Sequence, residues 1–128
     1  MKVLLDTHVW LWYLLGEPYL SQTHRNIIDD ESNDLSLSSI SIWEAHLLIE
    51  RGRLPVTDPP ATWIDKAIRT LHVREAGITF AIAARSRSIM LDHQDPADRV
   101  IAATAAEMKA PLLTADARLL TCPDIRCL

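Results

Sequence analysis

Residues 92–106 read Asp-His-Gln-Asp-Pro-Ala-Asp-Arg-Val-Ile-Ala-Ala-Thr-Ala-Ala and describe a helix with an acidic entrance and an apolar body. Asp95 stands where an N-cap belongs, and Pro96 takes the first helical position. Asp98 falls in the opening turn, where backbone N–H groups and the helix dipole favour negative charge. Small and apolar residues then recur at helical spacing as far as Met108. The pattern predicts a helix that packs closely against a sheet and places its acids at the sheet's edge.

The composition is that of one soluble globular domain, which we expect to span residues 1–128 without a membrane segment. Hydrophobic residues make up 48% of the chain and charged residues 23%. Asp6 and His8 interrupt the opening apolar run, so we interpret this run as a buried strand and not as a secretion signal. Cys122 and Cys127 have no further cysteines to complete a metal site and are expected to be free thiols. These features indicate a cytoplasmic protein.

The net charge of −4 argues at first against a nucleic-acid partner, which usually calls for a basic face. Divalent cations bound to a cluster of acids would reverse the sign locally and leave the remaining charge nearly balanced. Four arginines would then be available for phosphate contacts, although each one taken alone is more simply a solvated surface residue. These are Arg51, Arg53, Arg85 and Arg87.

Strand-like and helical patterns alternate along the whole chain. We expect strands at residues 2–6, 35–40, 72–75 and 110–114. Helices are expected at residues 7–17, 21–30, 41–51, 61–71, 79–89 and 92–109, with a brief helical turn after residue 116. This alternation predicts an α/β fold with three layers, in which a central parallel sheet is flanked by helices.

Four carboxylates follow the predicted strands or open the helices after them. They are Asp6, Glu44, Asp98 and Asp116. Because the carboxyl ends of parallel strands share one edge, we expect these four side chains to converge there. Carboxylates packed together repel one another, and no lysine lies beside any of them in sequence, so a cation is the natural partner. Oxygen ligands favour Mg²⁺ or Mn²⁺, and such a site activates water for attack on a phosphodiester.

Each acid also has a purely structural interpretation. Ser41 and Glu44 have the spacing of a capping box, Asp95 and Asp98 serve a helix N-terminus, and Asp116 is placed to cap a short helix. Asp6 is the hardest acid to explain in this way, because a carboxylate directly after a buried strand is costly unless something pairs with it. Since four such acids fall on one predicted edge, we favour the metal site.

Polar and aromatic neighbours complete the prediction. The hydroxyls of Thr7 and Thr114 stand beside acids and are placed to orient a metal-bound water. His8 and His93 lie near acids, and we interpret them as hydrogen-bonding neighbours in preference to ligands. The tryptophans are most simply core residues, although Trp12 lies on a different face from Trp10 and indicates a partner surface on the first helix. The full tryptophan set is Trp10, Trp12, Trp43 and Trp63.

These motifs, taken together, resemble those of the PIN-domain ribonucleases and in particular the VapC-type toxins of bacterial toxin–antitoxin pairs. The resemblance covers nearly the whole chain in the right order. It rests on residues 4–12, 39–44, 93–105 and 113–116, whose sequences are LLDTHVWLW, SISIWE, HQDPADRVIAATA and LTAD. The segment from Gly52 to Gly77 carries no family signature.

The resemblance implies a Mg²⁺- or Mn²⁺-dependent endoribonuclease that a VapB-type antitoxin holds inactive and that usually forms a homodimer. Its RNA substrate is not named by any motif. Carried over residue by residue, the catalytic and metal-binding set is Asp6, Glu44, Asp98 and Asp116, with Asp95 as an accessory acid. The antitoxin is expected to contact an apolar groove formed by the first two helices.

Three alternatives stay open at this point. The chain could be a PIN-like metal-binding interaction module that only engages a partner, or a nuclease with an RNA-processing role outside toxin–antitoxin systems. Phosphoryl transfer through an aspartyl intermediate is disfavoured, because Asp6 has no second acid two residues later and Asp116 has no lysine at the strand end.

Overall fold

A computed structural model describes residues 1–128 and contains a four-stranded parallel sheet in the order β3-β2-β1-β4. The strands are β1 (Lys2–Leu5), β2 (Asp34–Ser38), β3 (Arg74–Ala76) and β4 (Leu112–Leu113). The helices are α1 (Thr7–Leu15), α2 (Gln22–Asp29), α3 (Ser39–Glu50), α4 (Pro60–Thr70), α5 (Phe80–Ser88), α6 (Pro96–Met108) and α7 (Ala117–Leu120). None of the helices has the length and apolar character needed to cross a membrane.

The central strand β1 supplies both cores of the molecule. Val3, Leu4 and Leu5 are fully buried, as the uninterrupted apolar run predicts for a strand covered on both faces. Val3 and Leu5 join a cluster with residues of α1, α2, α3 and α4, whereas Leu4 joins a second cluster with residues of α6 and α7. Because successive side chains of a strand point to opposite faces, the two clusters lie on opposite sides of the sheet.

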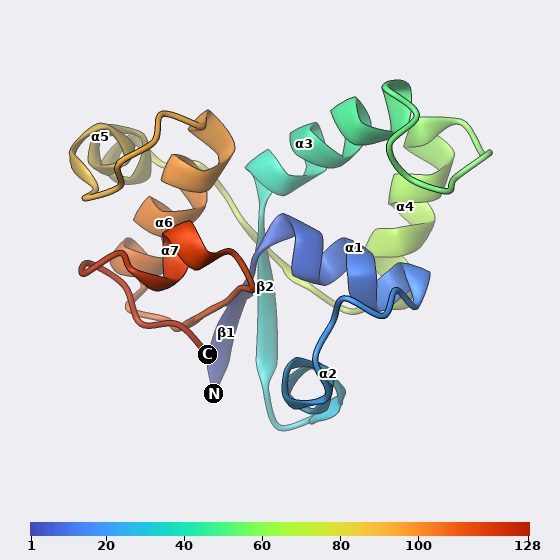
Figure 1. Cartoon of the computed structure of the whole chain (residues 1–128), viewed down its shortest axis with the longest axis horizontal. Coiled ribbons are helices and arrows are strands. Elements are labelled where there is room, and N and C mark those ends of the chain that lie inside the picture. The colour runs from blue at the N-terminus through green and yellow to red at the C-terminus, as the bar shows by residue number, and fades with distance from the viewer.

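The predicted three-layer α/β fold is therefore confirmed. In Figure 1, α1–α4 lie on one side of the sheet and α5–α7 on the other, with β1 and β2 between them. All three strand pairings are parallel, so every strand ends at the same edge. That edge faces the gap between the two helical layers.

Helix α6 begins as the sequence predicts. Asp95 is its N-cap, with Oδ1 accepting a hydrogen bond from the backbone N–H of Ala97 at 3.0 Å, and Pro96 is its first residue. Asp98 lies in the first turn. The alanines at 97, 102, 103 and 105 are buried, which is the close packing expected of a helix with small side chains on a sheet.

The prediction for the start of α3 is wrong. The helix begins at Ser39 with Ser38 as N-cap, since the Ser38 hydroxyl accepts a hydrogen bond from the backbone N–H of Ile40 at 3.2 Å. Ser41 is therefore inside the helix and Glu44 lies in the second turn, so these two residues do not form a capping box. The hydroxyl of Ser41 is buried and is free to serve the site described below.

One aromatic side chain expected in the core points outward instead, since Trp43 is 52% exposed on α3. Trp10 is fully buried and packs against Trp63 with 6.5 Å between ring centroids, as expected of core residues. Trp12 is half-buried, which agrees with its place on a second face of α1. Cys122 and Cys127 are free thiols.

Candidate active site

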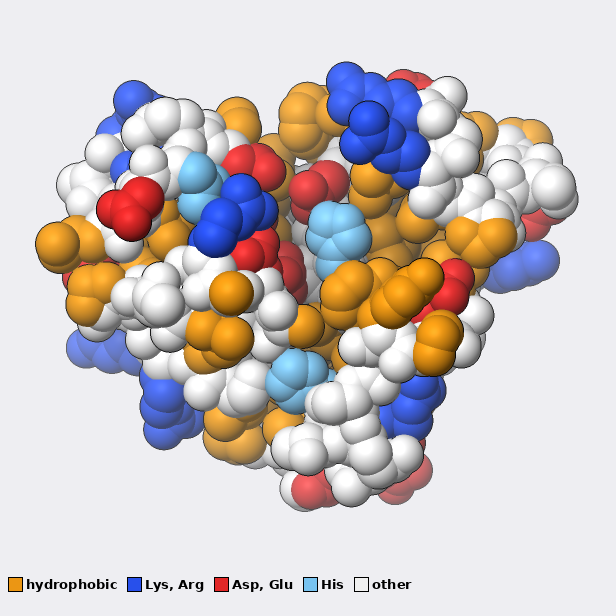
Figure 2. Space-filling model, viewed as in Figure 1, with side chains coloured by type: hydrophobic (Ala, Val, Ile, Leu, Met, Phe, Trp, Pro, Cys, Tyr) orange, Lys and Arg blue, Asp and Glu red, His pale blue; other side chains and the backbone are white.

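Acidic side chains gather where the sheet's carboxyl edge meets the hollow between the helical layers, and Figure 2 shows them there beside a histidine and a cationic side chain. Asp6 follows β1 directly, and Thr114 follows β4. Asp98 and Asp116 come from the starts of α6 and α7, and Glu44 comes from α3. The site thus draws on both helical layers and two strands.

Asp6 is held from two sides at the bottom of the site. Its side chain is 4% exposed. Oδ1 accepts from the backbone N–H of Thr7 at 2.8 Å, and Oδ2 accepts from the Thr114 hydroxyl at 2.8 Å. Burial raises the pKa of this carboxyl, while the hydrogen bond from Thr114 opposes the rise. The two hydrogen bonds fix the orientation of the carboxylate, and this is the role found for Thr114.

Thr7 links the first strand's end to α3. Its hydroxyl donates to the buried Ser41 hydroxyl at 2.7 Å. This contact ties α1 to α3 at the point where Glu44 approaches the site. Burial is the main cause of a raised pKa for the half-buried Glu44, the Thr7 side chain lowers that pKa, and the negative charges of Asp6 and Asp95 raise it further.

Asp98 is the most perturbed acid of the molecule, with its pKa raised from 3.8 to about 7. Burial is the largest cause, since the Asp98 side chain is only 10% exposed. The like charges of the other acids also raise it. These are Asp95, Asp6, Asp116 and Glu44. Since such charges act only over short distances, these four acids lie within electrostatic range of Asp98.

Arg118 supplies a cation that the sequence analysis did not anticipate. Its Nη2 donates to Oδ2 of Asp116 at 2.9 Å, its Nε donates to Oδ1 of Asp116 at 3.2 Å, and Nη2 also reaches Oδ2 of Asp98 at 3.4 Å. The hydrogen bonds from Arg118 hold the pKa of Asp116 below its ordinary value. No lysine lies beside any of the acids in sequence, but an arginine does. An arginine two residues after Asp116, on the same short helix, is the signal that was missed.

His93 lies against Asp98, and its ring is held by the turn before α6. Nδ1 accepts from the backbone N–H of Asp95 at 3.3 Å, and Nε2 lies 3.6 Å from Oδ2 of Asp98. Nε2 is buried and has no hydrogen-bond partner. His8, by contrast, is exposed and packs at a tilt against the Trp12 ring with 5.8 Å between centroids, so its predicted role as a hydrogen-bonding neighbour is not found.

Arg99 supports the site from behind. Its guanidinium is buried and donates to five backbone carbonyls, at distances from 2.8 to 3.2 Å. The acceptors are Ser86, Arg87, Ile89, Leu91 and His93. Because a guanidinium has five N–H donors, every one of them is used. Arg99 thereby fixes the end of α5 and the loop that presents His93.

The acids suit a hard divalent cation by the chemistry of their donors. Carboxylate oxygens are what Mg²⁺ and Mn²⁺ prefer, and the mutual repulsion that raises the pKa of Asp98 is what a bound cation would relieve. No three acid, histidine or cysteine side chains are already arranged at ligand distances, and Arg118 pairs with both Asp98 and Asp116. The acids therefore suit a divalent cation, provided that Arg118 releases Asp98 and Asp116 when the cation binds.

Known proteins share both the sequence and the fold. The family model of the PIN domain matches residues 3–122. Ribonuclease VapC22 of Mycobacterium tuberculosis is 36% identical over 118 residues, which are 91% of this chain and 88% of that protein. The crystal structure of VapBC2 from Rickettsia felis bound to a promoter DNA fragment contains a chain with a TM-score of 0.75, at 14% identity and with 100% and 98% of the two chains covered.

Two further solved structures have the same fold. DNA-bound VapBC from Salmonella typhimurium has a TM-score of 0.73 at 18% identity, with 100% of this chain and 97% of that chain covered. FitAcB from Neisseria gonorrhoeae has a TM-score of 0.70 at 22% identity, covering 98% and 96%. The fold and the matched model make this chain a member of the PIN-domain family. Its similarity to Ribonuclease VapC22 over nearly its whole length places it among the VapC-type members, which confirms the resemblance read from the motifs.

Proposed function

We propose that the chain is a Mg²⁺- or Mn²⁺-dependent endoribonuclease that hydrolyses RNA phosphodiester bonds, as a toxin controlled by a VapB-type antitoxin. The observation that carries the proposal is the cluster around Asp98, where burial and four like charges raise its pKa to about 7. A protein keeps such a cluster of carboxylates at a cost in stability, so a bound cation is its natural use. The similarity to Ribonuclease VapC22 supports RNA as the substrate.

The residues that would hold the cation are Asp6, Glu44, Asp98 and Asp116, with Asp95 as an accessory acid. The bound metal would supply a Lewis acid and lower the pKa of a coordinated water. Thr114 and the backbone of Thr7 keep the oxygens of Asp6 in fixed positions.

His93 and Arg118 would contribute to proton transfer and to binding of the substrate's phosphate. His93 places its Nε2 beside Asp98 and is available to carry a proton or to contact a phosphate oxygen. Arg118, once it leaves the acids, offers a guanidinium to the substrate's phosphate.

The experiment is cleavage of a mixed-sequence RNA by the purified protein with Mg²⁺ or Mn²⁺. Asp98→Asn and Asp6→Asn should each reduce the rate by more than about 100-fold, because each removes a ligand charge from the cation site. Asp58→Asn, an equal change of charge on the loop before α4, is the matched control and should cleave like the wild type. Thermal unfolding verifies that the variants are folded. Full activity in EDTA, or in either site variant, would disprove the proposal.

A second candidate function is a binding module whose acids hold a structural cation. The favouring observation is an aromatic surface at α1 and the segment after it, where the half-buried Trp12 packs at a tilt against Tyr19 with 5.5 Å between ring centroids, and Tyr19 is 67% exposed. Degradation of RNA by the purified protein alone would exclude this alternative. A nuclease with an RNA-processing role outside toxin–antitoxin systems would show cleavage without inhibition of growth on expression.

The same aromatic surface is our proposed contact for the antitoxin, and we place the pair in the cytoplasm. Exposed aromatic side chains of this kind are favoured at protein interfaces. Tyr19→Glu changes only an exposed side chain and should prevent co-purification with the antitoxin, as should Trp12→Glu if that variant folds. An antitoxin that still binds the Tyr19→Glu variant must use another face.

A homodimer is proposed as well. Phe80 is 97% exposed at the start of α5, and Ile78 just before it is 44% exposed. Large apolar side chains exposed together mark association surfaces. Phe80→Glu should convert a dimer into a monomer in light scattering, and a wild type that is already monomeric would contradict the assignment.

A further inference from the structure

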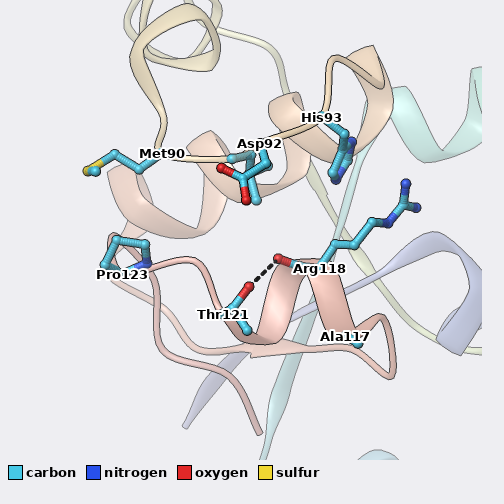
Figure 3. A pocket seen from close by; sticks show the side chains of 8 residues that line it. Met90, Asp92, His93, Ala117, Arg118, Thr121 and Pro123 are labelled. Carbon is cyan, nitrogen blue, oxygen red and sulfur yellow. Dashed lines mark hydrogen bonds between the residues drawn. The ribbon is translucent and has the colours of Figure 1, made fainter.

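A cleft of about 580 Å³ lies beside the acid cluster, between the loop that follows α5 and the short helix α7 (Figure 3). We propose that this cleft binds the nucleoside next to the scissile phosphate of a single-stranded RNA, and that Asp92 makes guanine the preferred base. The proposal rests on the nuclease function above and names a substrate feature for the same site.

The cleft and the acid cluster share a wall made of His93 and Arg118. Both side chains line the cleft, and both approach Oδ2 of Asp98, at 3.6 Å for His93 and 3.4 Å for Arg118. Figure 3 shows the two side chains at the same end of the cleft. A phosphate at the acid cluster would therefore have its attached nucleoside at the mouth of this cleft.

The charges of the lining residues determine which end of the cleft suits the phosphate and which suits the base. Arg118 is the only lysine or arginine in the lining, and it stands at the end next to the acids. Asp92 lies farther along the cleft, where it repels a phosphate but accepts hydrogen bonds from a base. Met90 and Pro123 lie at the far end and offer apolar surface to the face of a base. The phosphate thus belongs at the Arg118 end and the base beside Asp92.

A carboxylate in this position favours guanine over the other bases. Guanine presents two neighbouring N–H donors, N1–H and the N2 amino group, on its Watson–Crick edge, and a carboxylate accepts both at once. Adenine and cytosine present only an amino group there, and uracil presents one N–H. The Asp92 side chain is exposed, and Figure 3 shows it directed into the cleft without a hydrogen bond to the other lining residues. Single-stranded RNA exposes this edge of its bases for such readout.

The loop that carries Asp92 is held in place, as base recognition requires. Arg99 Nη1 donates to the carbonyl of Leu91 at 3.0 Å and to that of His93 at 3.1 Å, on either side of Asp92. The backbone N–H of Met90 donates to Asp124 Oδ2 at 3.0 Å. The carboxylate is therefore presented from a fixed backbone and loses little freedom when it binds.

The test measures fluorescence anisotropy of labelled uridine dodecamers in Ca²⁺ buffer, in which the central residue is guanosine, adenosine, cytidine or uridine. The wild type should bind the guanosine RNA about tenfold more tightly than the others, as expected for one well-placed bidentate base contact. Asp92→Asn should bind all four within about twofold of one another. Asp58→Asn, the charge-matched control, should keep the guanosine preference. Equal affinities in the wild type, or a preference that survives in Asp92→Asn, would overturn the proposal.

A parallel measurement separates this proposal from the nuclease function. Wild type and Asp92→Asn are incubated with Mg²⁺ and a long RNA of mixed sequence, and the cut ends are sequenced. Cuts beside guanosines that become indifferent to base in Asp92→Asn would support the cleft. If the wild type cleaves with a pattern that Asp92→Asn does not change, the cleft assignment is wrong and the nuclease function stands. If the wild type selects guanosine in binding but cleaves nothing, the nuclease function is wrong and the cleft stands.

Discussion

Asp98 and Arg99 are neighbours in the first turn of α6, and both are nearly fully buried. The surroundings of their two charges are nevertheless opposite in kind. The Arg99 guanidinium meets five backbone carbonyls and has every donor satisfied. The Asp98 carboxylate faces four other acids, a histidine at 3.6 Å and one arginine at 3.4 Å. The fold satisfies every hydrogen-bond donor of Arg99, but it leaves the negative charge of Asp98 without full compensation.

This contrast separates a structural charge from a functional one. Arg99 satisfies carbonyls at the end of α5 that have no partner within the helix, and it holds the following loop in place. Asp98 is placed on that rigid support in surroundings that raise its pKa. A buried charge that the protein's own groups do not compensate indicates that a bound ligand compensates it. Substitutions of Arg99, Asp98 and Arg118 test this distinction.

Replacement of Arg99 should cost the most stability. Arg99→Leu leaves buried carbonyls without donors and should lower the free energy of unfolding by about 4 kcal/mol, measured by urea denaturation. Arg87→Leu on the exposed side of α5 is the control and should change it by less than about 0.5 kcal/mol. A loss below about 1 kcal/mol in Arg99→Leu would mean that the hydrogen bonds from Arg99 to the five backbone carbonyls are not what holds this loop.

Replacement of Asp98 should have the opposite sign. The folded-state pKa of about 7 exceeds the value of 3.8 for the free side chain, so the folded protein binds more protons than the unfolded chain between these two pH values. Stability from this group is present below about pH 4 and is lost as the pH rises through 7. In metal-free buffer at pH 8, Asp98→Asn should therefore be more stable than the wild type by ~2 kcal/mol.

The measurement for Asp98 is thermal unfolding of both proteins in EDTA from pH 4 to pH 8. The advantage of Asp98→Asn should shrink towards pH 4, where the wild-type carboxyl is protonated in the folded protein and begins to be protonated in the unfolded chain as well. If the stabilities of the two proteins change in parallel with pH across this range, the pKa of Asp98 is not raised in the folded protein.

Arg118 should give the smallest effect, because its side chain is 57% exposed and its ion pairs are near the surface. Arg118→Gln frees the oxygens of Asp98 and Asp116 and should tighten Mn²⁺ binding about fivefold in titration calorimetry. Arg69→Gln, which breaks an ordinary exposed pair with Asp65 on α4, should leave the affinity unchanged. Weaker Mn²⁺ binding in Arg118→Gln would argue against competition between the arginine and the metal.

The sequence predicted well those parts of the site that are marked by local signals. A carboxylate directly after an apolar strand located Asp6, and an Asp-Pro pair before a helix located the entrance that Asp98 shares. Parallel strand order then placed the acids at one edge without knowledge of any contact. These features depend on backbone chemistry within a few residues, which sequence patterns report directly.

The features that were missed depend on contacts distant in the chain or on a choice among equivalent residues. Ser38, Ser39 and Ser41 are all good N-caps, and the fold selects Ser38, whose side chain is fully buried at the strand end. Arg99 looked like any charged residue in a first turn, because its five partners lie up to 13 residues away. Trp43 points outward on α3, and no local pattern distinguished it from the buried Trp10.

The two borders of the sheet are both closed to further strands. At β4, the backbone N–H of Leu128 donates to the carbonyl of Leu112 and that of Leu112 donates to the carbonyl of Arg126, so the last residues cover this border. At the other border, β3 is three residues long and exposes the charged Arg74 and Glu75. Short charged borders resist strand-to-strand aggregation. The helices and loops are therefore the surfaces that this fold leaves for assembly with a partner.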